Sequence, residues 1–222
     1  MKLVVVIPAY NEEKHIGQVI DGVKKYTKNI VVVDDASKDK TGEIAREKGA
    51  HVYRHIINRG LGGALGTGIK AALLEGADVI VTLDADGQHD PDDIPKLLEL
   101  IVKGEADVVI GSRFIRKQKL PFIRRVANYL FNIITMLLFG VFVTDSQSGM
   151  RAFTKKAARK IKILTDGMEV SSEIIKEVRA NKLRGREVPI KAIYTSYSLS
   201  KGQSFGAAIR TFIKLLIFRL TN

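Results

Sequence analysis

Five runs of apolar, mostly β-branched residues recur along the first 114 residues, and they restrict the possible folds more than any other feature. They lie in residues 2–10, 29–37, 50–56, 77–86 and 106–114. Each run is continuous, not alternating, which is typical of parallel strands covered on both faces. Helical patterns separate the runs, at residues 12–26, 41–48, 63–74 and 91–102. This alternation predicts an α/β fold with a mostly parallel, twisted sheet flanked by helices.

Polar residues follow four of these runs at the point where each strand is expected to end. They are "PAYNE" from Pro8 to Glu12, Asp34–Asp35, Asp84–Ala85–Asp86 and Gly111–Ser112–Arg113. Any one of them, taken alone, is also explained as a cap of the following helix. Because ligands of open α/β sheets bind beyond the carboxyl ends of the strands, the four together predict one shared crevice.

The acidic segment after the fourth run indicates a cation site. Asp84 and Asp86 are one residue apart, and carboxylates this close repel each other unless a cation or protons intervene. Their oxygen atoms, together with that of Gln88, suit Mg²⁺ or Mn²⁺, which often bridge to substrate phosphates. We interpret His89 as a capping or surface group in preference to a ligand. The acids at 92–93 are assigned to the N-terminus of the next helix.

The chain carries a net charge of +12, and the positive charge is unevenly placed. Six basic residues and no acid lie from Arg113 to Arg125, and no acid follows Glu187. Such segments suit the phosphates of a nucleotide, an anionic membrane or nucleic acid, although a solvated basic face gives the same pattern. Nucleic acid is disfavoured, because no set of stacking aromatic residues is interleaved with the basic ones. The absence of cysteine excludes thiolate sites and fits a reducing compartment, and the apolar run at the start predicts a strand, not a signal peptide.

Six segments occur in an order found in one enzyme family. They are "VVVIPAYNEE", "VVVDDASKDKT", "NRGLGGALGTGIKAA", "LDADGQHDP", "IGSRF" and "DSQSGMRAF". In these segments the chain resembles glycosyltransferase family 2, and more closely its dolichyl-phosphate mannose synthases and related polyprenyl-phosphate sugar transferases. The resemblance covers roughly Leu3 to Phe205 and implies a single domain of GT-A fold over residues 1–222. Its expected regions are a nucleotide-sugar-binding core (1–120), an interfacial helix region (121–144), an acceptor side with a lid (145–205) and a C-terminal amphipathic helix (206–222).

The resemblance also implies a nucleoside site at the first two strand ends. Pro8, Tyr10 and Glu12 are expected to contact the nucleoside of a GDP- or UDP-sugar. Val33 and Asp35 are expected to flank the base and ribose.

The donor diphosphate is expected at the next two strand ends. By the same resemblance, Asp84, Ala85 and Asp86 would line it, and Asp84, Asp86 and Gln88 would bind Mg²⁺ or Mn²⁺. Arg113 matches a family arginine that meets the donor phosphate, for which a guanidinium is well shaped. It is therefore a candidate catalytic residue.

The second half of the chain supplies further candidates by resemblance. Lys201 matches a lid cation that covers the phosphates, while Thr195 and Ser198 stand where the family has arginine and glycine. Asp145 and Glu173 match positions of catalytic bases or orienting groups.

The segment Val126–Thr144 is free of charge and mostly apolar. Asn128, Asn132 and Thr135 recur at helical spacing on one face, and Gly140 interrupts the segment. With basic residues before it, the segment is interpreted as an interfacial helix in the headgroup region. A single membrane span and a buried core helix are the alternatives.

Two further features favour contact with an anionic membrane surface. Arg124 and Arg125 enter the interfacial helix and are expected nearest the lipid phosphate. A second amphipathic helix is predicted at Ala207–Leu220. Together they predict peripheral attachment to the cytoplasmic face, unless a membrane-anchoring partner supplies the anchor.

The leading interpretation is an inverting transferase that moves mannose or glucose from a GDP- or UDP-sugar to dolichyl or polyprenyl phosphate. A family 2 transferase acting on a sugar or protein hydroxyl is the alternative, because it shares the donor motifs. A non-catalytic nucleotide-binding module is disfavoured, because Asp84, Asp86, Gln88 and Arg113 are all present. Processive polysaccharide synthases of this family need a tryptophan motif, and the chain has no tryptophan.

Overall fold

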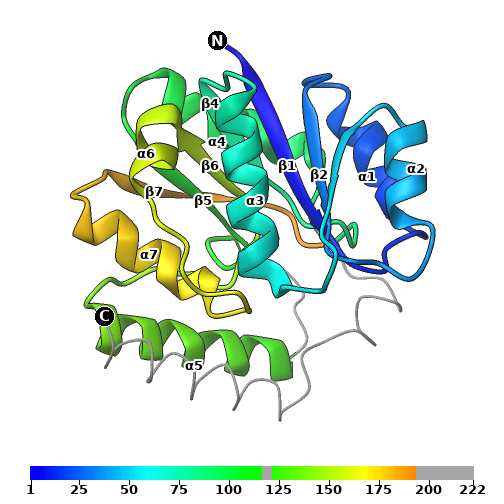
Figure 1. Ribbon diagram of the computed structural model, residues 1–222. Helices are drawn as coiled ribbons and strands as arrows, with labels where there is room; N and C mark the ends of the chain where they lie inside the picture. The colour runs from blue at the N-terminus through cyan, green and yellow to red at the C-terminus, as the bar shows by residue number, and fades with distance from the viewer. Residues whose placement is uncertain (117–121, 194–222) are drawn as a thin grey trace.

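One seven-stranded sheet forms the centre of the protein. The computed structural model describes residues 1–116 and 122–193, apart from the side chains of residues 122–125 and 127. The strands lie in the order β3-β2-β1-β4-β6-β5-β7 (Figure 1). Their bounds are Leu3–Ala9 (β1), Ile30–Asp34 (β2), His51–Arg54 (β3), Val79–Thr82 (β4), Val108–Ser112 (β5), Arg151–Thr154 (β6) and Gly185–Pro189 (β7). All pairings are parallel except those of β6, which runs antiparallel to β4 and β5.

Helices cover both faces of this sheet (Figure 1). On one face lie α1 (Ile16–Val23), α2 (Thr41–Glu47) and α4 (Ile94–Val102), the last preceded by the 3₁₀ turn η1 (Pro91–Asp93). On the other lie α3 (Gly60–Leu74), α6 (Lys155–Lys160) and α7 (Val170–Ala180). Strand β1 shows why its apolar run is continuous: Val5 and Ile7 belong to the first core, and Val4 and Val6 belong to the second. The predicted α/β class with a mostly parallel sheet is confirmed.

Three predicted helices differ from the observed ones at their starts, one of them α4, which begins at Ile94 after the turn η1. α1 begins at Ile16, because residues 13–15 form a turn in which the N–H groups of His15 and Ile16 both donate to the Glu12 carbonyl. α3 begins at Gly60, three residues early, because the Asp35 carboxylate accepts hydrogen bonds from the N–H groups of Arg59 and Gly60. A carboxylate at that place caps the helix from another strand. The strands β6 and β7 were not predicted.

Helix α5 (Phe122–Phe139) lies outside the layers that cover the sheet and runs beside α7 (Figure 1). Gly140, with a left-handed φ of 64°, follows its last residue, as the interruption in the sequence indicates. Among the described residues, no helix combines the length and the apolar character that a bilayer crossing requires.

The polar residues of α5 turn toward the protein together with Phe131 and Phe139, and a largely apolar face turns outward. Asn128 and Asn132 are 8% and 7% exposed and Thr135 is buried, whereas Tyr129 and Leu137 are 67% and 74% exposed. Helices that pack on a core in water show the reverse arrangement. The alternative of a buried core helix is therefore wrong.

Some predicted features fall outside the described residues. These are Lys201, Thr195, Ser198, the helix at 207–220 and the side chains of Arg124 and Arg125.

Candidate active site

Four polar strand ends meet at one edge of the sheet, as the sequence predicts. β1, β2 and β4 are parallel, so their carboxyl ends share that edge. β5 ends there too, because β6 lies between β4 and β5 and is antiparallel to both. Pro8 and Val33 are direct register partners on β1 and β2. Around Asp84 the electrostatic neighbours are Arg113, Arg151, Glu12 and Asp145.

The loops after β1 and β2 are tied to each other. The Asn11 N–H donates to Ser37 Oγ at 3.0 Å, and the Lys38 N–H donates to Asn11 Oδ1 at 2.8 Å. The Glu12 N–H donates to Thr41 Oγ1 at 2.7 Å. These bonds fix the "PAYNE" segment against the end of β2, where the nucleoside is predicted.

Asp35 is fully engaged within the protein. His55 Nδ1 lies 2.7 Å from Asp35 Oδ1, which also accepts from the Arg59 N–H, while Oδ2 accepts from the Gly60 N–H. The other ring nitrogen of His55 bonds Thr67 on α3 at 2.9 Å. Asp35 thus joins β2 to the start of α3, and its contact with base and ribose stays a prediction. Nothing in the sequence indicated that His55 would bond Asp35.

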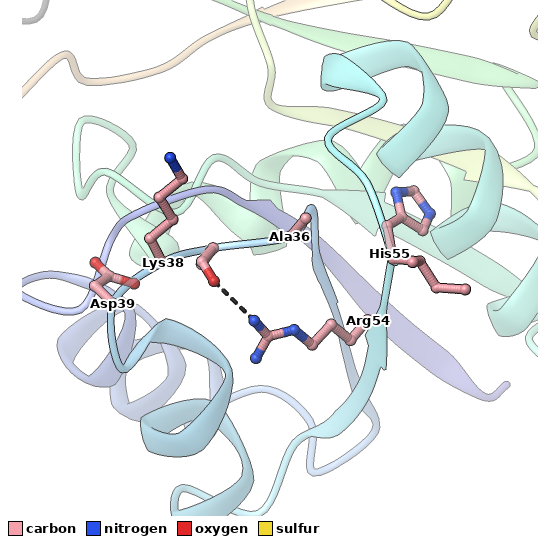
Figure 2. A pocket seen from close by; sticks show the side chains of 7 residues that line it. Ala36, Lys38, Asp39, Arg54 and His55 are labelled. Carbon is pink, nitrogen blue, oxygen red and sulfur yellow. Dashed lines mark hydrogen bonds between the residues drawn. The ribbon is translucent and has the colours of Figure 1, made fainter.

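An open hollow of about 790 Å³ lies beside this segment (Figure 2). Arg54 reaches along it and donates from Nη2 to the Ser37 carbonyl at 2.8 Å (Figure 2). Lys38 and His55 also line it. The hollow therefore adjoins the residues predicted to contact the nucleoside. Asp84 and Asp86 do not line it. Tyr10, at the end of β1, is 42% exposed and accessible to a ligand.

The acidic segment after β4 offers an oxygen donor set. Ala85 is buried, and the side chain of Asp84 is about one-third exposed. Asp86 accepts from the backbone N–H of Gln88 at 2.9 Å and also bonds the Gln88 side chain. No group of three His, Cys, Asp or Glu side chains converges among the described residues. Mg²⁺ is usually held by one or two carboxylates plus substrate phosphates, so two carboxylates and an amide fit it.

The backbone of Gly149 makes room for Asp84. A Cβ at Gly149 would lie 2.2 Å from the Asp84 carboxylate, so any other residue would displace that group. Thr82 Oγ1 donates to the Gly149 carbonyl at 2.8 Å and holds the backbone there. Burial raises the pKa of Asp84, while Arg113 and Arg151 oppose the rise.

His89 is buried, not on the surface as the sequence suggested. Only 3% of it is exposed, and Nδ1 lies 3.5 Å from Asp84 Oδ2. Burial, followed by the charge of Arg113, lowers the pKa of His89 to about 4, so the ring is neutral at pH 7. Asp90 caps η1, and Asp92 and Asp93 lie in that turn before α4, as predicted.

Arg151 is a buried cation that sequence reasoning missed. It opens β6 and lies in register with Thr82 and Ile110, directly behind the strand ends that lead to Asp84 and Arg113. Its Nη2 donates to the carbonyls of Ser146 and Ser171. Burial lowers its pKa to about 10, so it stays charged at pH 7. Its position within "DSQSGMRAF" was the only signal in the sequence.

Arg113 and Asp145 form a bidentate pair at the end of β5. Arg113 Nε and Nη2 donate to Asp145 Oδ2 and Oδ1 at 2.7 and 2.8 Å, and the Arg113 N–H donates to Oδ2 at 3.1 Å. The side chain of Asp145 is fully buried and that of Arg113 is 17% exposed. The structure thus joins two of the predicted catalytic residues. Asp145 also accepts a bond from Asn128, so four donors engage it.

Glu173 is placed differently from the other candidates. It lies in α7, is 1% exposed, and accepts hydrogen bonds from the backbone of Leu164 and from the backbone and hydroxyl of Thr165. These contacts fix the segment before α7. None of them joins Glu173 to Asp84, Asp86 or Arg113.

Comparison with known proteins identifies the family. The family model described as "Glycosyl transferase family 2" matches residues 4–162. An uncharacterised protein of Methanocaldococcus jannaschii is 49% identical over 225 residues, which cover 99% of this chain and 93% of that protein. A UDP-N-acetylglucosamine–dolichyl-phosphate N-acetylglucosaminyltransferase of Methanococcus voltae is 39% identical, covering 97% and 95%. An undecaprenyl-phosphate mannosyltransferase of Micrococcus luteus is 31% identical, covering 94% and 90%. The chain belongs to glycosyltransferase family 2 and is a transferase enzyme.

Solved structures show the same fold. Glucosyl-3-phosphoglycerate synthase of Mycobacterium tuberculosis, solved with Mn²⁺ and UDP, superposes with a TM-score of 0.75 at 21% identity. The match covers 98% of this chain and 79% of that one. The predicted GT-A fold is confirmed.

Proposed function

We propose that this enzyme transfers a hexose from a UDP- or GDP-sugar to the phosphate of a polyprenyl or dolichyl lipid, with Mg²⁺ or Mn²⁺. One observation carries the proposal. Helix α5 exposes its apolar face, and its polar face is hydrogen-bonded to the loop that contains Asp145, the partner of Arg113. This arrangement supports the proposal, because the predicted donor site would then lie next to a surface suited to lipid. Relatives in two organisms carry names that specify dolichyl and undecaprenyl phosphate.

The surface that we assign to α5 is an anionic membrane. Its apolar face would be stabilised by the acyl boundary, and the basic residues from Arg116 to Arg125 complement acidic headgroups. Arg124 and Arg125 lie in the first turn of α5. We propose peripheral attachment on the cytoplasmic face, which the cysteine-free sequence fits. A separate anchoring partner is an extension of this proposal.

The two candidate bases favour a phosphate acceptor over a hydroxyl. A hydroxyl acceptor needs a general base. Four donors engage Asp145 and three engage Glu173, so either group would have to break contacts before it took a proton. A lipid phosphate is already largely ionised at pH 7, since its second pKa is about 6. It needs positioning and cations more than a base.

The proposed step is a single displacement with inversion. A phosphate oxygen of the lipid bonds to the anomeric carbon while the bond from that carbon to the donor's β-phosphate oxygen breaks. The electron pair leaves with the nucleoside diphosphate, whose charge Arg113 would bind and Lys201 would cover. Asp84, Asp86 and Gln88 would hold the divalent ion, and a bound ion would neutralise the leaving diphosphate.

A donor panel tests this proposal. The full chain is incubated with a short polyprenyl phosphate and, in turn, UDP-glucose, UDP-N-acetylglucosamine and GDP-mannose, and lipid products are detected by mass spectrometry. We expect one donor to give a glycosyl lipid in Mn²⁺ or Mg²⁺ and none in excess chelator. No product from any donor would overturn the acceptor, and full activity in chelator would overturn the metal.

A further inference from the structure

Two asparagines on the inward face of helix α5 form hydrogen bonds with the loop at residues 144–146, which contains Asp145. Asn128 Nδ2 donates to Asp145 Oδ1 at 2.9 Å, and both side chains are buried. Asn132 Nδ2 donates to the Thr144 carbonyl at 2.7 Å, and its Oδ1 accepts from the Ser146 N–H at 2.9 Å. The helix therefore holds the loop on both sides of the carboxylate and at the carboxylate itself.

A single carboxylate oxygen connects α5 to the arginine of the donor side. Asp145 Oδ1 accepts from Asn128 Nδ2 and from Arg113 Nη2, at 2.9 and 2.8 Å. The other oxygen accepts from the backbone N–H and the Nε of Arg113. A turn of this carboxylate would move the guanidinium, so the donor that fixes Oδ1 contributes to the orientation of Arg113, beside the Arg113 N–H that bonds Oδ2.

The opposite side of the loop is held by strand β7. Glu187 accepts from the N–H and hydroxyl of Thr144 and from the Asp145 N–H, at 2.8 to 3.3 Å. β7 belongs to the sheet, whereas α5 lies outside the layers that cover it. Ser112 of β5 and Arg151 of β6 also bond this loop, at Thr144 and Ser146, and both belong to the sheet. Among the described elements that hold the loop, α5 is thus the one whose position an outside surface can influence.

We infer that Asn128 is a positioning residue. Through its hydrogen bond to Asp145, it relays the position that α5 takes on a lipid surface to Arg113, and so sets the affinity for the donor diphosphate. The inference rests on the proposed function for the role of Arg113 and for the lipid contact of α5. A surface that stabilises one position of α5 raises its population, and a ligand that needs the same position then binds more tightly.

Nucleotide affinity with and without vesicles tests this relay. Isothermal titration with UDP and with GDP, each with Mn²⁺, is run on the full chain alone and with vesicles of phosphatidylcholine and phosphatidylglycerol. We expect vesicles to tighten binding of one nucleotide to the wild type by about tenfold, the scale of one hydrogen bond to a charged group. Asn128→Ala should bind the vesicles equally well and lose this tightening.

Thr135→Val is the matched control. Thr135 lies on the same buried face, but its hydroxyl bonds Ser172 of α7 and not the Asp145 loop. This variant should keep the tightening, and Asn128→Ser, which retains a donor, should keep part of it. A merely structural role for Asn128 would weaken nucleotide binding equally with and without vesicles.

The outcomes separate this inference from the proposed function. Equal tightening in wild type and Asn128→Ala, or none in wild type that is bound to vesicles, would overturn the relay. Wild type that binds neither vesicles nor nucleotide would overturn both the relay and the assignments on which it rests. Tightening that disappears in Asn128→Ala, without any transfer to polyprenyl phosphate, would uphold the relay and reject the acceptor.

Discussion

Strand β5 carries an arginine–aspartate pair at each end, and the two pairs use the same hydrogen bonds. At its start, Asp107 accepts from the Arg184 N–H, Nε and Nη2 at 2.9, 3.1 and 3.3 Å. At its end, Asp145 accepts from the same three groups of Arg113. The Arg184 side chain is 55% exposed, and that of Arg113 is 17% exposed.

The surroundings of the two pairs differ more than their geometry does. Arg184 also bonds the Gly104 carbonyl and joins β5 to the chain before β7. Arg113 lies among Asp84, His89 and Arg151, and its partner is held by α5. A bidentate pair alone does not mark a catalytic site; a pair among other buried charges at the ligand edge of the sheet is a better candidate.

The largest effect on the transfer rate is expected among the aspartates after β4, where one belongs to the predicted site and another lies at the surface outside it. Asp86→Ala should lower transfer by more than about 10³-fold, because the diphosphate loses its ion, with thermal unfolding nearly unchanged. Asp92→Ala is the control, since Asp92 lies in the same acidic run but bonds Lys25 and Tyr26 at the surface. Steady-state rates and melting curves measure both variants. Retained activity in Asp86→Ala would remove Asp86 from the site.

The next largest effect is expected from the two arginines that form the pairs at the ends of β5. Arg113→Lys should lower kcat/KM by roughly 10²-fold, because an ammonium cannot reproduce the bidentate fork. Arg184→Lys makes the same change at the scaffold pair and should leave kcat/KM within about twofold. Similar losses in both variants would mean that Arg113 acts only through stability.

Replacing the two candidate catalytic bases, Asp145 and Glu173, tests whether the acceptor is a phosphate or a hydroxyl. Asp145→Asn should reduce kcat by less than about 10²-fold, since a phosphate acceptor needs no base. Glu173→Gln should cost no more than that. Asp107→Asn is the control and should leave kcat unchanged. A loss near 10⁴-fold in Asp145→Asn would favour the hydroxyl acceptor.

The smallest effect is expected from the Arg184–Asp107 pair, on thermal stability at acidic pH. The hydrogen bond from Arg184 lowers the pKa of Asp107, and burial partly opposes this. The pair's contribution to stability is therefore present above the unfolded pKa of about 4 and is lost as pH falls through the lower folded value. Between about pH 5 and pH 3, wild type should lose a few degrees more of Tm than Asp107→Asn. Parallel pH profiles of the two Tm values would contradict the assignment.

The strand ends of the site could be predicted from sequence because each ends a continuous apolar run. β4 leads directly into Asp84, and the parallel arrangement follows from burial on both faces. The polar spacing of Asn128, Asn132 and Thr135 likewise predicted one face of α5. Local pattern sufficed wherever the chemistry lies next to the element that positions it.

The rest depends on contacts between distant parts of the chain. β6 is short, runs antiparallel and starts with Arg151, a residue whose burial needs the charges of Asp84 and Asp145 around it. Asn128 and Asp145 are 17 residues apart, and no local pattern assigns one to the other. His89 looked like a surface group in the sequence, because its burial goes with a bridge to Ala192, a residue that is distant along the chain.

The acceptor is tested most directly by one pair of assays. The enzyme is given its active donor with a short polyprenyl phosphate, and separately with the polyprenol of the same chain length, in the same vesicles. Because the proposed nucleophile is an ionised phosphate oxygen, we expect glycosyl lipid from the phosphate and none from the alcohol. Transfer to the alcohol at a comparable rate, or none to the phosphate, would contradict a polyprenyl-phosphate transferase.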